Sequence, residues 1–106
     1  MASFTLTPVE KGILRCQRTG PLSHDDVQAL GAFLDDYRGK LLVDLTDADP
    51  EECARQIRQL RPMMPTAAIF GVDLHPSILD VPESYYLHEV RLFGSEAEAM
   101  TWLREQ

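Results

Sequence analysis

Side chains that could bind a metal ion or take part in phosphoryl chemistry occur mainly in two short segments. The residues of these two segments whose side chains carry an oxygen atom or an imidazole ring are Thr46, Asp47, Asp49, Asp73 and His75. These follow two predicted parallel strands, 41–45 and 66–70, whose carboxyl ends form the sheet edge where ligands bind. Such oxygen ligands suit a hard cation. Phosphoryl chemistry there also needs an acidic pair after the first strand and a lysine late in the chain, and the sequence has neither. We therefore interpret the acids as loop residues and helix caps, and expect no metal ion and no cofactor.

Other catalytic motifs are missing from the sequence. It contains no G-x-S-x-G, G-x-x-x-x-G-K-[ST] or H-E-x-x-H segment, and its glycines do not cluster as a dinucleotide-binding loop requires. His24 and His88 have no partner at metal-ligand spacing, so we expect a surface and a structural role. Cys16 and Cys53 are expected to be buried free thiols, unless the fold brings them together as a disulfide. Because no nucleophile–base pair can be assembled, the sequence predicts that this protein is not an enzyme.

A row of arginines is a candidate contact surface. Arg55, Arg58 and Arg61 are spaced to lie along one side of a predicted helix, where their guanidinium groups would suit an acidic partner. The alternative is a solvated helix face on which these arginines pair with Glu51 and Glu52.

The hydrophobic pattern predicts a single α/β domain over residues 1–106. The predicted strands are residues 4–7, 13–18, 41–45, 66–70 and 89–93. Three helices are expected to begin after Ser23, Asp49 and Ser95, and one short helical turn is expected at 77–80. Short strand–helix–strand connections require parallel pairing, whereas the first two strands form a hairpin. The sequence therefore predicts a mixed five-stranded sheet, four strands parallel and one antiparallel at the edge, with the continuous apolar strands in the centre.

Local details of these elements are also predicted. Pro8 is expected to stop the first strand, with a turn at 9–12. In the first helix, residues Val27, Leu30, Phe33, Leu34 and Tyr37 are expected to form one buried stripe. Gly39 is expected to end that helix in a left-handed conformation. In the second helix Asp49 is expected to cap, Pro50 to take the first turn and Glu52 to complete a capping box.

Composition excludes several classes of protein. The 106 residues carry a net charge of −7, which disfavours binding to nucleic acid or an anionic membrane. No apolar run approaches the roughly 20 residues that span a bilayer. The first residues have no charged start and no apolar core, so we expect no secretion signal and a cytoplasmic location. An exposed edge strand at 3–7 could pair with its copy in a homodimer, unless Pro8 and the hydroxyl side chains prevent this.

Three stretches of the sequence resemble the STAS superfamily, and within it the SpoIIAA-like group. These are Thr19-Gly20-Pro21-Leu22-Ser23 before the first helix, the strand Gly39-Lys40-Leu41-Leu42-Val43-Asp44-Leu45, and Val90-Arg91-Leu92-Phe93 followed by Glu96-Ala97-Glu98-Ala99-Met100-Thr101-Trp102-Leu103. The resemblance implies a small, non-enzymatic cytoplasmic module that binds a partner protein. In anti-sigma-factor antagonists of this family, a serine in Asp-Ser-x-Gly at the second helix is phosphorylated. Here the matching segment, 46–52, has neither serine nor glycine, so we expect that the phosphorylation switch is absent.

We therefore predict a regulatory or protein-interaction module. Its expected contact surface is the second helix with its preceding loop, at Thr46, Asp47, Glu51, Arg55 and Arg58. The alternative is a protein that binds a nucleotide or a small apolar ligand in a groove near residues 72–88, with Asp73, His75 and Tyr85 as binding residues. The resemblance implies that an apolar ligand would lie between sheet and helices, where Met63 and Met64 are either lining or gap-filling core residues.

Overall fold

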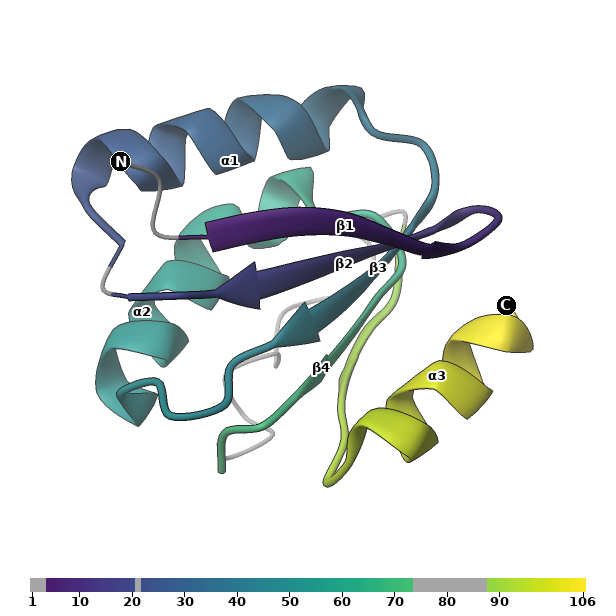
Figure 1. The fold of residues 1–106 in the computed structure, drawn as a ribbon. Helices are drawn as coiled ribbons and strands as arrows, with labels where there is room; N and C mark the ends of the chain where they lie inside the picture. The colour runs from purple at the N-terminus through teal and green to yellow at the C-terminus, as the bar shows by residue number, and fades with distance from the viewer. Residues whose placement is uncertain (1–3, 21, 74–87) are drawn as a thin grey trace.

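The computed structural model describes residues 4–20, 22–73 and 88–106, and it has the predicted α/β architecture (Figure 1). Its elements are β1 (Phe4–Glu10), β2 (Ile13–Arg18), α1 (His24–Asp36), β3 (Lys40–Asp44), α2 (Pro50–Leu60), the short 3-10 helix η1 (Arg61–Met63), β4 (Ala67–Phe70), β5 (Val90–Leu92) and α3 (Glu96–Arg104). The three main helices are confirmed. The helical turn expected at 77–80 lies outside the described residues. Within the described part of the chain, no helix is long and apolar enough to cross a membrane.

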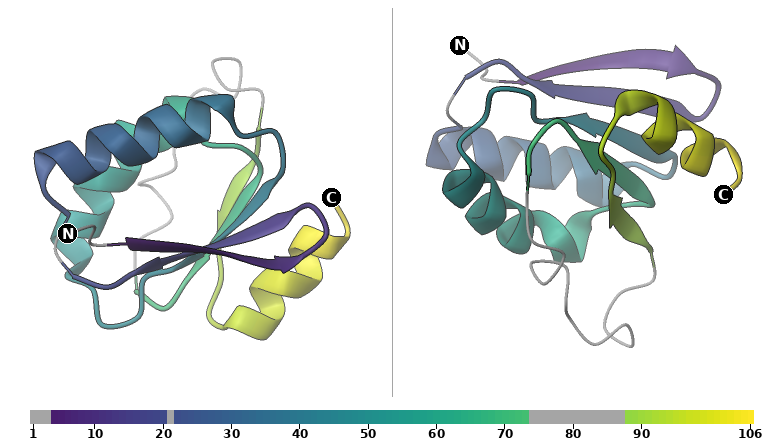
Figure 2. Two further views of the ribbon diagram at one scale, coloured as in Figure 1. Left: turned by 45° about the horizontal axis from the view of Figure 1, so that its top comes forward. Right: turned by 90° about the horizontal axis from the view of Figure 1, so that it is seen from below.

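The five strands form one sheet in the order β1-β2-β3-β4-β5. β1 pairs antiparallel with β2, and the other neighbouring pairs are parallel. This confirms the predicted mixed sheet with its continuous apolar strands near the centre. Helices α1 and α2 cover one face and α3 covers the other, which makes a three-layer arrangement (Figure 2).

Two apolar clusters fill the spaces between these layers. Leu41 and Val43 of β3 point toward α1 and α2, whereas Leu42 between them packs against α3, because successive strand residues face opposite sides. Ala99, Met100, Trp102 and Leu103 of α3 are buried. Ser95 caps this helix and accepts a hydrogen bond from the backbone amide of Glu98. The carboxyl ends of β2 and β3 lead into loops that line a polar hollow, and they position the candidate site.

The prediction that Pro8 stops the first strand is wrong. β1 continues through Pro8 to Glu10, with an irregularity in the register between these two residues. Proline is tolerated there because β1 is an edge strand, which has a neighbour on only one side. The turn is therefore shorter than expected, since only Lys11 and Gly12 separate the paired residues, and Gly12 has φ +82°.

Two expectations for α1 also need correction. Phe33 is not part of the buried stripe, since it is 38% exposed and stacks on Tyr37 at a centroid distance of 5.6 Å. The helix ends with Tyr37 in an extended conformation, so Gly39 does not supply a left-handed stop. Gly39 is instead required by close packing, because a Cβ there would collide with the Tyr37 hydroxyl and lie 2.9 Å from the Gly12 carbonyl oxygen. The predicted Ser23 cap is confirmed.

Candidate functional site

The loop between β3 and α2 is held in one conformation by a buried carboxylate. Asp44, at the end of β3, is 5% exposed. One of its oxygens accepts hydrogen bonds from the backbone amide of Thr46 at 2.9 Å and from the Thr46 hydroxyl at 2.6 Å. The other accepts from the Arg15 guanidinium at 2.6 Å, and Arg15 also contacts Glu96 of α3 at 3.0 Å. Burial alone would raise the pKa of Asp44, but the bonds from Thr46 and Arg15 outweigh it and lower this pKa below its usual value.

A close approach from β4 restricts the same loop. Gly71 follows β4 with φ +93°, and a Cβ there would lie 2.6 Å from the Thr46 backbone nitrogen. The left-handed conformation of Gly71 and its lack of a side chain therefore let the loop pack against the end of β4. Asp47 has a positive φ of 65°, which aspartate tolerates better than most residues. Contacts with Asp44 and Gly71 thus constrain the loop where it presents Thr46 and Asp47 to solvent.

Helix α2 begins as the sequence predicts, but its expected capping box is incomplete. The Asp49 side chain accepts a hydrogen bond from the amide of Glu52, and Pro50 occupies the first turn. The Glu52 carboxylate does not bond back to the cap. It pairs with Arg18 at 2.8 Å and accepts a hydrogen bond from Gln56.

Arg18 links β2 to α2 through an almost completely buried side chain. Its guanidinium pairs with Glu52 and donates to the Gly20 carbonyl at 2.8 Å and to the Cys53 sulfur at 3.1 Å. The Arg18 side chain is 7% exposed. The hydrogen bond from Arg18 lowers the pKa of Glu52, against the opposing effect of burial. Burial raises the pKa of the Cys53 thiol, although Arg18 acts in the opposite direction. Neither the arginine nor the thiol is therefore free to act as a reactive group.

Beside Arg18, a polar hollow of about 550 Å³ opens at the carboxyl ends of β2 and β3. The charged side chains that line it are Arg18, Asp44, Asp47, Asp49 and Glu52. Three of these acids are already engaged, Asp44 and Glu52 in ion pairs and Asp49 as a cap. Within the ranges that the structure describes, no group of three or more His, Cys, Asp or Glu residues is arranged to hold a metal ion.

The structure leaves all the predicted contact residues exposed. Thr46, Asp47, Glu51, Arg55 and Arg58 are all exposed, the first two on the loop and the others on α2. We call these five residues the α2 surface. Among the described residues, Glu51, Arg55 and Arg58 form no ion pair and no hydrogen bond through their side chains.

Arg61 does not continue the arginine row. It lies in η1 and is half-buried, and its guanidinium donates to the His88 carbonyl oxygen at 2.9 Å, next to β5. Pro62 causes this change, because proline interrupts the helix and η1 follows with a tighter winding. The expected row of three is therefore a pair, Arg55 and Arg58. Within the described ranges, no ion pair joins Arg55 or Arg58 to Glu51 or Glu52, and Glu52 pairs with Arg18, although the charge of Arg55 also helps to lower the pKa of Glu52. The solvated helix face of the alternative is observed, since both arginines are exposed.

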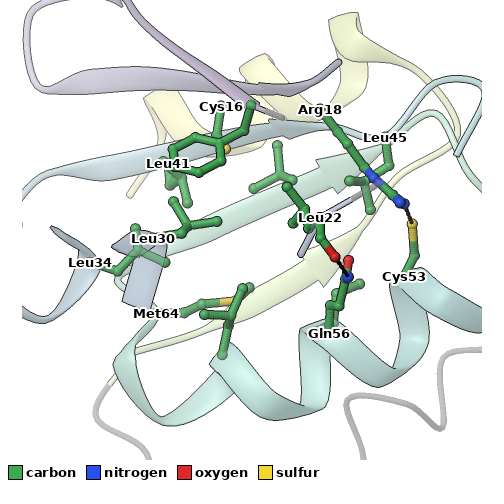
Figure 3. Close-up of a pocket in the computed structure, with 14 residues that line it drawn as sticks. Cys16, Arg18, Leu22, Leu30, Leu34, Leu41, Leu45, Cys53, Gln56 and Met64 are labelled. Carbon is green, nitrogen blue, oxygen red and sulfur yellow. Dashed lines mark hydrogen bonds between the residues drawn. The ribbon is translucent and has the colours of Figure 1, made fainter. Parts of the chain in front are cut away.

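An apolar cavity lies beneath α1 and α2, on the inner side of the α2 surface (Figure 3). Its volume is about 50 Å³. Side chains from the sheet and from both helices line it, among them Cys16, Leu30, Leu41, Ile57 and Met64. Arg18 and Gln56 are its polar lining residues; Gln56 is buried and donates to the Leu22 carbonyl oxygen at 3.3 Å.

The remaining sequence predictions have mixed outcomes. Cys16 and Cys53 are buried free thiols, as expected, and burial raises the pKa of Cys16 to about 11. Asp73 is exposed, whereas His75 and Tyr85 lie outside the described residues, so the alternative ligand site near 72–88 stays a prediction. Met64 lines the cavity and Met63 is a partly buried residue packed on the core. His24 is exposed, as expected.

Arg18 and Gln56 belong to the site although neither was predicted from the sequence. Arg18 ends a strand and faces the same side of the sheet as Cys16, two residues earlier. Since Cys16 was expected to be buried, an arginine on that inward side could have indicated a buried ion pair. Gln56 lies among the buried residues of α2, next to Cys53 and Ile57, and gave no signal of its own in the sequence. Comparisons of this chain with protein-family models, with curated proteins and with solved structures find no match.

Proposed function

We propose that this chain is a non-enzymatic regulatory or protein-interaction module, similar to STAS domains of the SpoIIAA-like group, and that it acts in the cytoplasm through the α2 surface. The observation that supports this is the contrast between two sets of charges. Asp44, Glu52 and Arg18 around the surface are buried or partly buried and paired. Glu51, Arg55 and Arg58 on the surface are exposed and unpaired within the described residues. Charges held ready on a rigid element favour recognition of a partner protein.

The surroundings of Thr46 argue against catalysis and against a phosphorylation switch. Its hydroxyl donates to Asp44, whose lowered pKa makes this carboxylate a weak base. A phosphate on Thr46 would lie near the carboxylates of Asp44, Asp47 and Asp49, which also line the polar hollow. Like charges at such distances repel one another. We propose that the module works without modification at this position.

The proposal is tested by site-specific crosslinking in the native host. A photo-crosslinking amino acid is placed at Arg55, and in a control protein at Lys11 in the distant hairpin turn. We expect one partner protein to be crosslinked from position 55 and not from position 11. The crosslinked protein is then identified and purified, and its binding is measured by calorimetry.

Charge reversal separates specific binding from incidental contact. We expect Arg58→Glu to weaken binding of the identified partner by at least about tenfold, and Lys11→Glu, with the same change in net charge, to leave it unchanged. Equal crosslinking from both positions, or binding that Arg58→Glu does not alter, would contradict the proposal.

The cavity favours a second candidate function, the binding of a small apolar ligand between the sheet and the two helices. Its lining is almost entirely apolar, and such cavities stay dry and take up apolar guests. A volume of about 50 Å³ admits only a short alkyl group or a gas atom unless α1 and α2 separate. Native mass spectrometry of freshly purified protein tests this. An added mass that disappears on denaturation supports a ligand, and bare protein supports the interaction module.

A further inference from the structure

The strand β1 lies at a free edge of the sheet. Its inner side pairs with β2, and its outer side has no neighbouring strand among the described residues (Figure 2). Such an edge presents unpaired backbone amides and carbonyls to which a further strand can bind. β1 is seven residues long, whereas β5 at the opposite edge has three. An incoming strand therefore finds the longer template at β1.

Exposed apolar side chains border this edge. Among the described residues, the large apolar side chains that are exposed are Val9 and Phe33. Val9 belongs to β1 itself. Phe33 lies on the side of α1 away from α2, because Gly31, two residues earlier, faces α2. Its stacking partner Tyr37 reaches the hairpin turn and donates to the Gly12 carbonyl oxygen at 3.4 Å. Both exposed apolar residues thus flank the free edge.

We infer that β1 pairs antiparallel with β1 of a second copy of this chain, so that the two sheets join as one. The sequence of β1 complements itself about Leu6. With a two-fold axis at this residue, Leu6 lies opposite the partner's Leu6, and Phe4 lies opposite the partner's Pro8 on the same face. On the other face, Thr5 lies opposite the partner's Thr7. Apolar side chains thus meet apolar ones and hydroxyl groups meet hydroxyl groups, and such cross-strand pairs stabilise neighbouring strands.

The shape of β1 favours this register. The strand is irregular between Pro8 and Glu10. An axis placed later would carry the pairing across this irregularity, and an axis placed earlier would carry it beyond Phe4, where β1 begins. The axis at Leu6 keeps residues 4–8 paired. Whichever alternate residues present their backbone outward, about four backbone hydrogen bonds form, since Pro8 has no amide hydrogen but accepts through its carbonyl.

No charged side chain opposes the pairing within this stretch. Residues 4–8 are uncharged, and the charged residue of β1, Glu10, pairs with Arg104 of α3 at 3.0 Å. Because each copy contributes the same edge, the contact closes at a dimer and does not extend into a fibre. The α2 surface shares no residue with this edge. The pairing therefore does not depend on the proposed function, and a dimer would present two copies of the α2 surface.

The expected dimer is weak, and salt strengthens it. Five paired residues span about 17 Å and bury less than the roughly 800 Å² per partner of a standard interface. Each copy carries a net charge of −7, so two copies repel each other, and salt screens this repulsion. We therefore expect a dimer that forms at high concentration and becomes tighter as salt is added.

Charged substitutions on β1 combined with sedimentation velocity test the pairing. The wild-type chain is measured over a range of concentrations at low and at high salt. Thr5→Glu/Thr7→Glu and Thr5→Lys/Thr7→Lys change exposed positions, and each places like charges opposite each other at both threonine pairs. We expect each double variant to raise the dimer dissociation constant by at least about tenfold. An equimolar mixture of the two puts opposite charges at these pairs, so we expect it to form a heterodimer at least as tight as the wild-type dimer.

Two further variants separate the register from net charge. Thr5→Lys/Thr7→Glu leaves the net charge unchanged and places opposite charges at both pairs when the axis lies at Leu6, so we expect it to dimerise at least as tightly as the wild type. Gln28→Glu/Gln106→Glu adds the same charge as Thr5→Glu/Thr7→Glu at exposed positions outside β1. We expect this control to dimerise like the wild type. Thermal unfolding of each variant confirms that it is folded.

Three results would overturn the pairing. A wild-type chain that stays monomeric at millimolar concentration in high salt excludes it. A dimer that survives both like-charge variants shows that another surface joins the copies. A Thr5→Lys/Thr7→Glu variant that stays monomeric shows that Thr5 does not face the partner's Thr7. Crosslinking from position 55 reports on the α2 surface separately, so each of these results leaves the proposed function standing.

Discussion

The sharpest consequence of this structure concerns Asp44, whose carboxylate joins β3, the following loop and Arg15. We consider Asp44→Asn, which keeps the size of the side chain and removes its charge. The remaining carbonyl oxygen can still accept the two hydrogen bonds from Thr46. The new amide group, however, faces the Arg15 guanidinium, which lies 2.6 Å from the oxygen that it replaces. Two donors then oppose each other in a site that is 5% exposed.

The expected cost follows from these contacts. A hydrogen bond to a charged group contributes about 1.5–3 kcal/mol, and breaking a buried ion pair costs about 3–5 kcal/mol. Arg15 is 23% exposed and keeps its contact with Glu96, so its charge is not left without a partner. We therefore expect a loss of about 2–3 kcal/mol in the free energy of unfolding. For a domain of this size that corresponds to a decrease in Tm of about 10 °C.

Urea unfolding at pH 7 and at pH 3 measures this loss and its pH dependence. Because the pKa of Asp44 is lower in the folded chain than in the unfolded chain, its contribution is present above the unfolded pKa, near 4, and is lost as the pH falls through the folded pKa. The difference between wild type and Asp44→Asn should therefore be largest near neutral pH and should narrow below pH 4.

A double-mutant cycle with Arg15→Met assigns the loss to the ion pair, and Asp36→Asn on the exposed end of α1 serves as a matched control. We expect a coupling energy above about 1 kcal/mol and a control within about 0.5 kcal/mol of wild type. A loss below about 1 kcal/mol at pH 7, or a loss that does not change with pH, would refute the role given to Asp44.

Three further outcomes are expected from urea unfolding. Gly71→Ala places a Cβ 2.6 Å from the Thr46 nitrogen at φ +93°, so it should cost more than about 2 kcal/mol, and a near-neutral result would mean that this loop is not closely packed. Val43→Ile adds one methylene to a strand residue that lines the cavity and should stabilise by up to about 0.8 kcal/mol; a loss would show that the space is already filled. Because Arg18 lowers the pKa of Glu52, wild-type stability should fall as the pH drops below about 4.5, and Glu52→Gln should lose about 1 kcal/mol at pH 7 and less at pH 3.5. Equal losses for Glu52→Gln at both pH values would contradict this pH dependence.

The sequence predicted much of the fold because its signals are local. Apolar residues at spacings of two or of three and four identify strands and helices without reference to the rest of the chain. The same holds for helix starts, where Ser23, Asp49 and Ser95 each accept a hydrogen bond from an amide three residues later. Short connections and the run of strand–helix–strand units also predicted the hairpin and the parallel pairing of the other strands, which the structure confirms, whereas the full strand order comes from the structure.

Local patterns were wrong where the environment of a residue decided its role. Pro8 continues a strand because that strand lies at an edge of the sheet. Phe33 is 38% exposed and stacks on Tyr37, outside the core clusters of the described residues. Gly39 is needed for close contact with a hairpin that is distant in sequence. Arg61 points to β5 because η1 follows α2. Neighbours in space, and not in sequence, account for each of these differences.

In the candidate site, too, some features follow from local sequence and others depend on neighbours in space. The sequence alone determined that α2 begins at Asp49 and Pro50, and that Glu51, Arg55 and Arg58 share its exposed face, because helical periodicity fixes which side chains lie together. Only the tertiary structure decided which charges remain unpaired. Arg18 pairs with Glu52, which lies 34 residues later in the sequence, and Arg15 pairs with Asp44, which lies 29 residues later. Such pairs depend on how strands and helices are placed against one another, and no local pattern encodes that placement.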